Sequence, residues 1–202
     1  MTFADPVRVL VVPGLHDSGP AHWQSWLQRQ SRHALRVQQH DWDEPDLDRW
    51  AARIAATLAG QPPARWIAVA HSFGCLALAR HLARAASAPP DPRRPIRAAL
   101  LVAPADPRKF SAEPLLPAGR LPLRSTLIGS ETDPWMTGNE ARRWAGVWGA
   151  RFISLGDAGH INAEAGFGPL PQAQAVVADM THRLAGELRI DRAHPAELSY
   201  AI

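Results

Sequence analysis

The sequence of 202 residues contains one cysteine, Cys75, and only one lysine, Lys109, among its 22 basic residues. A single thiol cannot form an intramolecular disulfide, and a chain of this length buries about 70% of its unfolded surface without one. We therefore expect a core held together by apolar packing, with Cys75 as a small buried residue rather than a reactive thiol. This cysteine usage gives no sign of an oxidising compartment.

Long apolar runs and clustered charges are missing as well. No stretch approaches the roughly 18 consecutive apolar residues of a membrane span, and residues 1–6 lack the basic and apolar segments of a signal peptide. The net charge is +3 and the arginines are scattered, whereas nucleic-acid-binding proteins gather basic side chains on one surface. We expect a cytoplasmic protein that binds neither nucleic acid nor membrane, and no feature of the sequence points to a particular oligomeric state.

The sequence does contain a regular alternation of short apolar runs and amphipathic segments. Six apolar runs predict strands, at residues 8–12, 35–40, 66–70, 96–102, 123–129 and 151–155. Helical patterns fall between them, among them one that Ser18 is expected to cap and others at 47–58, 138–148 and 171–188. Such alternation is typical of an α/β three-layer sandwich, in which helices cover both faces of a mostly parallel sheet.

The same pattern predicts one domain over residues 1–202, with a core at about 7–188 and a loosely held tail at 189–202. The proline-rich segment 88–95 is expected to be a surface connection, because the alternation resumes directly after it. Residues 103–122 lack either periodicity and predict a loop with at most one helical turn. Because no other segment has room for a lid, we expect no cap domain and a shallow pocket.

Three polar residues follow predicted strands in the order Ser72, Asp133 and His160. Ligands bind at the carboxyl ends of parallel strands, and this is the order of an α/β-hydrolase triad. A serine hydroxyl attacks well only when a base removes its proton, which an imidazole does near neutral pH. A buried carboxylate then fixes the imidazole tautomer and stabilises the imidazolium. We predict Ser72 as nucleophile, His160 as base and Asp133 as the acid partner.

The serine lies in the segment Ala70-His71-Ser72-Phe73-Gly74, between an apolar run and a helical pattern. This arrangement is typical of a nucleophile elbow, a sharp strand-to-helix turn whose neighbours must be small. Ala70 replaces the first glycine of the consensus and keeps a small side chain. The oxyanion that forms during acyl transfer needs fixed N–H donors, and we predict the amides of Phe73 and Leu15 in that role.

The candidate site has alternatives. Asp106 also follows a predicted strand and competes with Asp133 for the acid role, whereas Asp157 is too close in sequence to His160 to orient it. No spacing typical of metal ligands occurs, so neither a metal nor a cofactor is expected. His22 is expected on the surface. The residues expected to line the pocket are His16, His71, Trp42, Phe110, Trp135 and Phe167.

Several segments resemble the small serine hydrolases of the retinoblastoma-binding protein 9 and YdeN type. The resemblance covers about residues 7–185 and is carried by 11–14, Ser18, His22-Trp23, 70–75, 101–106, 159–162 and 166–171. It implies a lidless α/β-hydrolase with Ser72, Asp133 and His160 as triad, and it agrees with alanine at position 70. Members of this family are mostly known as hydrolases of model esters or small amides.

We therefore expect a serine hydrolase that cleaves small carboxylic esters, or less readily amides, through an acyl-enzyme on Ser72. The alternative is an α/β-hydrolase-fold interaction module that has lost turnover. The two hypotheses differ in whether the Ser72 hydroxyl is activated.

Overall fold

Six parallel strands form the centre of the computed structural model, which describes residues 6–87 and 95–190. The strands are β1 (Val7–Val12), β2 (Leu35–Arg36), β3 (Arg65–His71), β4 (Ile96–Val102), β5 (Arg124–Gly129) and β6 (Arg151–Ser154). Their order across the sheet is β2-β1-β3-β4-β5-β6, and each neighbouring pair is parallel. The predicted α/β sandwich around a parallel sheet is confirmed.

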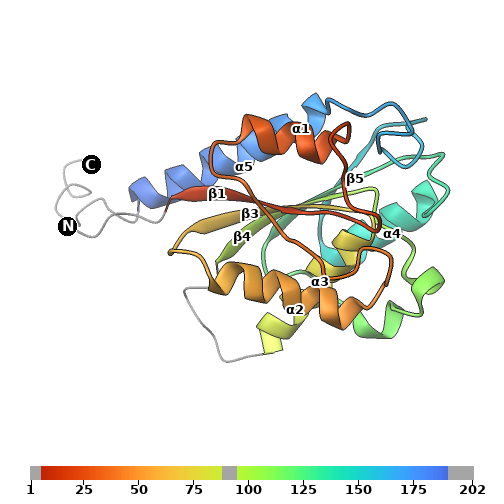
Figure 1. Cartoon of the computed structure of the whole chain (residues 1–202), viewed down its shortest axis with the longest axis horizontal. Coiled ribbons are helices and arrows are strands. Elements are labelled where there is room, and N and C mark those ends of the chain that lie inside the picture. The colour runs from red at the N-terminus through yellow and green to blue at the C-terminus, as the bar shows by residue number, and fades with distance from the viewer. Residues whose placement is uncertain (1–5, 88–94, 191–202) are drawn as a thin grey trace, which may run out of the picture.

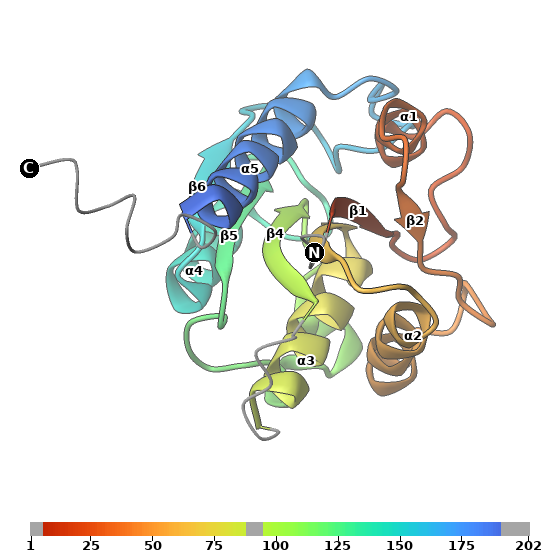
Figure 2. The same ribbon diagram turned by 90° about the vertical axis from the view of Figure 1, so that its left-hand side faces the viewer.

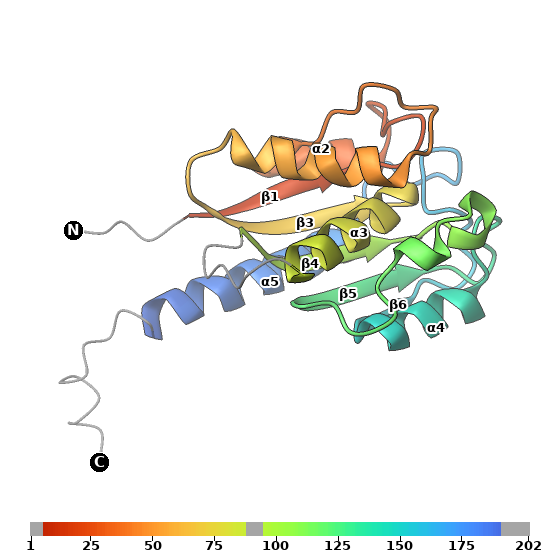
Figure 3. The same ribbon diagram turned by 90° about the horizontal axis from the view of Figure 1, so that it is seen from below.

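Helices cover both faces of this sheet (Figure 1). They are α1 (Trp23–Gln30), α2 (Leu47–Ala59), α3 (Phe73–Ser87), α4 (Gly138–Trp148) and α5 (Pro171–Ile190). The view along the sheet separates α1 and α5 on one face from α2 and α3 on the other (Figure 2). Helix α4 lies on the α2 and α3 side, beside β5 and β6 (Figure 3). The result is a three-layer sandwich.

The alternation of side chains in each central strand supplies both layers of the core. In β1, Leu10 and Val12 pack toward α2, α3 and α4, whereas Val9 and Val11 pack toward α1 and α5. Strand β3 divides its residues in the same way. Strands that are buried on both faces read as continuous apolar runs, which is why their positions were predictable.

Strand β2 is shorter than the predicted run 35–40, because it lies at the edge of the sheet and pairs only with β1. One further backbone hydrogen bond joins the Val37 amide to the Val11 carbonyl oxygen, at 2.9 Å. The Gln38 carbonyl instead accepts a hydrogen bond from the side chain of Arg53 in α2. After Val37 the chain therefore leaves the sheet.

The predicted cap of α1 is wrong. His22, not Ser18, is the N-cap residue, and its Nδ1 accepts a hydrogen bond from the Gln24 amide at 3.1 Å. The Ser18 hydroxyl donates to Gln24 Oε1 at 2.6 Å. Residues 16 and 17 have positive φ angles, so the chain turns before it reaches the helix. Ser18 thereby braces the first helical turn through a side chain.

The segment between β4 and β5 contains two 3₁₀ turns rather than the single turn predicted, η1 (Pro107–Phe110) and η2 (Glu113–Leu115). In the described part of the chain, no inserted domain covers the carboxyl ends of the strands. None of the described helices is both long and apolar enough to cross a bilayer. Most of the predicted connection 88–95, and the tail from 191 onward, lie outside the described residues.

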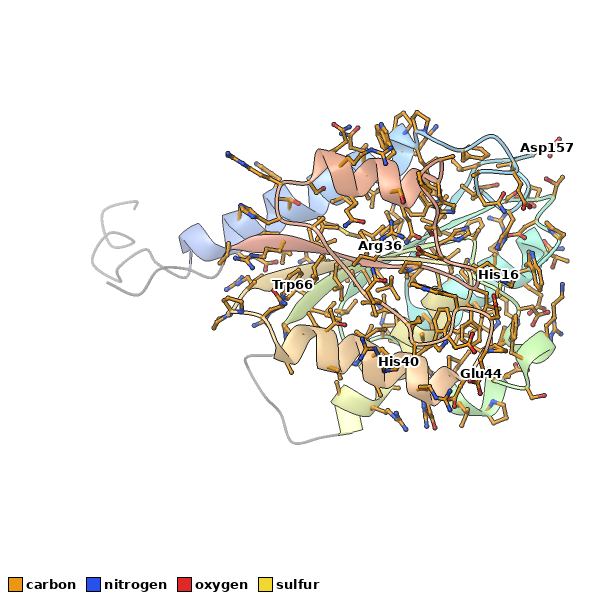
Figure 4. All side chains as sticks on the ribbon, in the orientation of Figure 1. His16, Arg36, His40, Glu44, Trp66 and Asp157 are labelled. Atoms are coloured by element: carbon orange, nitrogen blue, oxygen red, sulfur yellow. The ribbon has the colours of Figure 1, made fainter. Side chains whose placement is uncertain are left out.

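Because every strand runs in the same direction, the loops that follow the strands gather at one end of the sheet. Figure 4 shows His16 and Asp157 at that end, and Trp66 near the opposite end, where β3 begins. The residues predicted to act together all follow strands, so the topology brings them to the same edge.

Candidate active site

Ser72 occupies a sharp turn between β3, which ends at His71, and α3, which begins at Phe73. Its φ angle is +53°, an uncommon conformation for a residue with a side chain. The turn brings α3 so close to β1 that a Cβ on Gly74 would overlap the carbonyl oxygens of Val12 and Pro13. Glycine is therefore required at position 74. Ala70 lies one residue inside the strand, where its methyl group is buried in the core.

His160 connects the serine to a carboxylate. Its Nε2 lies 2.9 Å from Ser72 Oγ, and its Nδ1 lies 2.9 and 3.0 Å from the two carboxylate oxygens of Asp133. The Asp133 side chain is 2% exposed and also accepts a hydrogen bond from the Trp135 amide at 2.8 Å. The three predicted residues therefore form a continuous hydrogen-bonded chain.

Two side chains that the sequence analysis missed join the loops that carry this chain. Ser130 Oγ donates to the Gly156 carbonyl and accepts from the Ala158 amide, at 3.2 and 3.1 Å. Thr132 Oγ1 accepts from the Gly159 amide at 3.1 Å and donates to the Asp157 carboxylate at 2.6 Å. Their position directly after the apolar run of β5 was the available sequence signal, because serine and threonine hydroxyls in loops often hydrogen-bond to nearby backbone groups.

Asp106, the alternative acid, lies in a different environment. Its carboxylate accepts hydrogen bonds from the backbone amide and the guanidinium of Arg108, and it caps η1. Burial alone would raise the pKa of Asp106, but the Arg108 hydrogen bonds and charge lower it overall. The carboxylate that reaches His160 belongs to Asp133.

The two backbone amides predicted to bind an oxyanion both belong to residues near Ser72. Phe73 follows the serine, and Leu15 lines the same cavity as Ser72. In the described part of the chain, neither amide donates a hydrogen bond to a protein acceptor. An oxyanion hole requires N–H donors that are free of other acceptors, and the assignment of these two amides to that role stays a prediction.

Two further histidines, His71 and His22, form a row of ring contacts that ends at His160. His71 is buried, and its Nε2 donates to the His160 carbonyl oxygen at 3.0 Å. The His71 ring contacts the rings of His160 and His22, with centroids 4.8 and 4.7 Å away. The expectation that His22 lies on the surface is wrong, because its residue is only 5% exposed. Residues 22–24 begin α1 and are buried against the sheet, and the alternation of polar and apolar residues did not predict this burial.

Burial keeps both of these histidines neutral. It lowers the pKa of His71 well below the ordinary value, and repulsion from the neighbouring His160 and His22 rings, when these are protonated, lowers it further. The pKa of His22 falls from 6.5 to about 4, mainly through burial and then through the charges of Arg36 and His160. Neither ring therefore carries a charge near neutral pH.

We expect acidification to destabilise the fold through these histidines. Below pH about 6.5 these histidines bind protons in the unfolded chain but not in the folded one. The free energy of unfolding therefore falls as the pH decreases toward 4. With the His22 pKa at about 4, this residue alone accounts for a loss of about 2 to 3 kcal/mol at pH 4.5. Urea denaturation at pH 7 and 4.5 measures the loss. His22→Asn should show a correspondingly smaller difference, and an equal difference would contradict the assignment.

A cavity of about 300 Å³ opens onto Ser72 and His160. Four of the predicted pocket residues line it, namely His16, His71, Phe110 and Trp135. Trp42 does not, because its ring packs edge-on against Trp50 of α2, with centroids 5.8 Å apart. Phe167 does not either, because it packs against the core layer beneath α1 and α5. The lining residues that were not predicted as pocket wall are Asp17, Gly19, His22, Asn162, Ala163 and Glu164.

The walls of the cavity differ in character. Trp135 is 42% exposed and lies parallel to Phe110, with ring centroids 6.3 Å apart and planes inclined by 17°. Lys109 Nζ lies 5.1 Å from the centre of the Trp135 ring. In the loop after β1, the His16 side chain is largely exposed to solvent and pairs with Asp43 at 2.7 Å. One wall is aromatic and the others are polar.

The lone thiol lies in the core rather than in the cavity. Cys75 is fully buried in α3, and burial raises the pKa of its thiol. Among the described residues, no group of three or more histidine, cysteine or carboxylate side chains is arranged to hold a metal ion.

Comparison with known proteins agrees with this geometry. Residues 9–179 match a family model described as serine hydrolase. A comparison with curated proteins found no match. A solved structure described as a YdeN-like hydrolase, from Pectobacterium atrosepticum, is 35% identical, with a TM-score of 0.81, 89% of this chain covered and 92% of that one.

Two more distant structures share the fold. The ydeN gene product of Bacillus subtilis is 20% identical, with a TM-score of 0.67 over 85% of this chain and 97% of that one. Est1E of Butyrivibrio proteoclasticus is 12% identical, with a TM-score of 0.62 over 90% of this chain and 89% of that one. The resemblance to YdeN-type proteins is thus confirmed, and the chain belongs to the serine hydrolase family, with an α/β-hydrolase fold.

Proposed function

We propose that the protein hydrolyses small carboxylic esters, and less readily amides, through an acyl-enzyme on Ser72. In this proposal Ser72, His160 and Asp133 are the catalytic triad. The observation that carries it is the continuous chain from Ser72 Oγ through the His160 ring to the Asp133 carboxylate, with 2.9 Å at each His160 nitrogen. A protein that only binds partners has no need of this arrangement at a strained turn.

The proposed reaction has two halves. His160 Nε2 takes the proton from Ser72 Oγ as this oxygen attacks the carbonyl carbon. The resulting oxyanion accepts hydrogen bonds from the Leu15 and Phe73 amides. As the bond to the leaving group breaks, the imidazolium returns its proton to the departing alcohol or amine. Water then attacks the acyl-enzyme with the same base, which releases the acid and regenerates Ser72.

Asp133 supports each proton transfer. Its carboxylate accepts the Nδ1–H of His160, so that Nε2 of the neutral ring has a lone pair directed at Ser72. The same negative charge stabilises the imidazolium that forms in the transition state. Since the Asp133 side chain is buried, water does not compete for this hydrogen bond.

The cavity favours a small substrate. Its volume of about 300 Å³ is at the lower end of ligand pockets, which span about 300–1,000 Å³. Phe110 and Trp135 offer an apolar wall beside Ser72 and His160. We therefore propose short or compact ester substrates.

A fluorophosphonate probe tests the proposal directly. The activated Ser72 oxygen should displace fluoride and form a phosphonate ester, which is detected as an increase in intact mass and located in the Ser72 peptide. Protein that has been unfolded in urea is the control, because activation requires the folded triad. No label on the folded protein at neutral pH would refute the proposal and favour an interaction module that has lost turnover.

A further inference from the structure

His22 presents a donor that the proposed triad does not use. Its Nδ1 accepts a hydrogen bond from the Gln24 amide at 3.1 Å. A backbone N–H donates only to a ring nitrogen without a proton, so the proton of the neutral ring lies on Nε2. The hydrogen bond from the Gln24 amide therefore makes His22 Nε2 a donor.

This donor has no partner in the described part of the chain, although the atom is buried. A buried donor without an acceptor is destabilising, and native proteins contain few of them. The other side chains with an unpartnered buried polar atom are Arg8, Trp23, Gln39, Ser125 and Trp144. His22 is distinguished from these residues because it also lines the cavity that contains Ser72.

The first turn of α1 holds the His22 ring in a fixed place. Gln24 Nε2 donates to the carbonyl oxygens of Val12 in β1 and Val69 in β3, at 3.2 and 3.0 Å. Ser18 Oγ donates to the amide oxygen of the same side chain. The ring also meets His71 edge-on, with centroids 4.7 Å apart. A donor fixed by its surroundings binds an acceptor with little loss of entropy.

We propose that His22 Nε2–H binds a second acceptor oxygen of the substrate, separate from the carbonyl oxygen that reacts. This inference rests on the proposed hydrolase function. It names the substrate class as esters or amides whose acyl or alcohol part carries an ether, hydroxyl or carbonyl oxygen. The reacting carbonyl oxygen already has the Leu15 and Phe73 amides, so the His22 donor serves another group.

The charges around the cavity favour a neutral acceptor over a carboxylate. Asp17 and Glu164 both line the cavity. The charge of Asp17 is balanced by Arg36, whose Nη1 lies 2.7 Å from it, whereas Glu164 adds an exposed negative charge. A substrate carboxylate would meet that charge, and an uncharged oxygen would not.

Matched ester pairs test this proposal. In the acyl pair, p-nitrophenyl butyrate and p-nitrophenyl methoxyacetate differ by one CH₂ replaced with oxygen. In the alcohol pair, butyl acetate and 2-methoxyethyl acetate differ in the same way. The quantity measured is the ratio of kcat/KM for the ether ester to that for the alkyl ester. Comparing this ratio between variants cancels the intrinsic reactivity of the esters.

Two variants of the same residue separate the donor from the helix cap. His22→Ser keeps an oxygen that can accept the Gln24 amide but removes the ring donor, and His22→Asn keeps the cap and supplies an N–H group. We expect His22→Ser to lower the ether-to-alkyl ratio about tenfold in one of the two pairs, which corresponds to about 1.4 kcal/mol, the scale of one hydrogen bond. His22→Asn should restore part of that ratio.

Ratios in both pairs that stay within twofold of wild type for both variants would overturn the inference, even if overall rates fall. That outcome would leave His22 as a structural cap, while labelled Ser72 would still support the hydrolase proposal. If wild type hydrolyses none of the four esters and takes up no fluorophosphonate, both proposals fail together. The two failures are therefore distinguishable.

Discussion

Ser72→Ala is expected to lower kcat on p-nitrophenyl butyrate by about 10⁶-fold, the loss seen when a triad nucleophile is removed from a serine protease. The alanine methyl group cannot attack a carbonyl carbon, and the His160 base is left without the proton that it transfers. Residual turnover above the uncatalysed rate should remain, because the Leu15 and Phe73 amides still bind the oxyanion. Stopped assays at saturating ester with concentrated enzyme measure this residual turnover.

The change should leave the fold intact. Serine and alanine face the same restriction at the φ angle of +53°, and only the hydroxyl group is removed. Far-UV circular dichroism and the urea midpoint should therefore match those of wild type. An activity loss accompanied by unfolding would not test the nucleophile, so activity is compared only between variants with matching midpoints.

The double variant Ser72→Ala/His160→Ala provides the sharper control. Residues that act as one unit have non-additive effects, so the double variant should be about as slow as Ser72→Ala alone. Losses that multiply would indicate that His160 acts independently of Ser72. Retention by Ser72→Ala of more than about a tenth of wild-type kcat would contradict the proposed acyl-enzyme, given the expected scale of the loss.

The sequence predicted the sheet and the order of the candidate triad because both depend on local patterns. Strands β1, β3, β4 and β5 are buried on two faces, so each forms an apolar run of nearly the right length. Ser72 and Asp133 follow such strands, whereas His160 follows the edge strand β6, and parallel topology then brings all three to the same end of the sheet. Prediction of the edge strand β2 failed in length, because pairing on one side does not require a continuous run.

The walls of the cavity were harder to predict, since they depend on where loops lie in three dimensions. Trp42 and Phe167 both lie in loops, yet one packs on α2 and the other on the opposite layer of the core. The expectation that His22 lies on the surface failed because this residue caps α1 and its ring packs against the rings of Trp23 and His71. A histidine at the N-cap can accept a hydrogen bond from the amide two residues further along the chain, as a serine cap does. The sequence analysis did not consider this role for His22.

Asp133→Asn is expected to lower kcat by about 10⁴-fold, the effect of the corresponding change in a serine protease. The Trp135 amide donates to Asp133 Oδ1 at 2.8 Å, so the asparagine would keep its oxygen there. Its NH₂ group would then face His160 Nδ1 and donate to it. The neutral ring would be forced to carry its proton on Nε2, where it can no longer accept the proton of Ser72.

Asp106→Asn is the matched control, because it makes the same chemical change in the other carboxylate that follows a strand. Asp106 binds Arg108 rather than His160, so its substitution should change kcat by less than about threefold, well below the triad effect. It should instead lower stability slightly, since an exposed Arg–carboxylate pair is worth about 1 kcal/mol or less. Initial rates and urea midpoints of both variants measured side by side decide the assignment. A large loss in Asp106→Asn with little loss in Asp133→Asn would move the acid role to Asp106 and would require His160 to turn away from its observed partner.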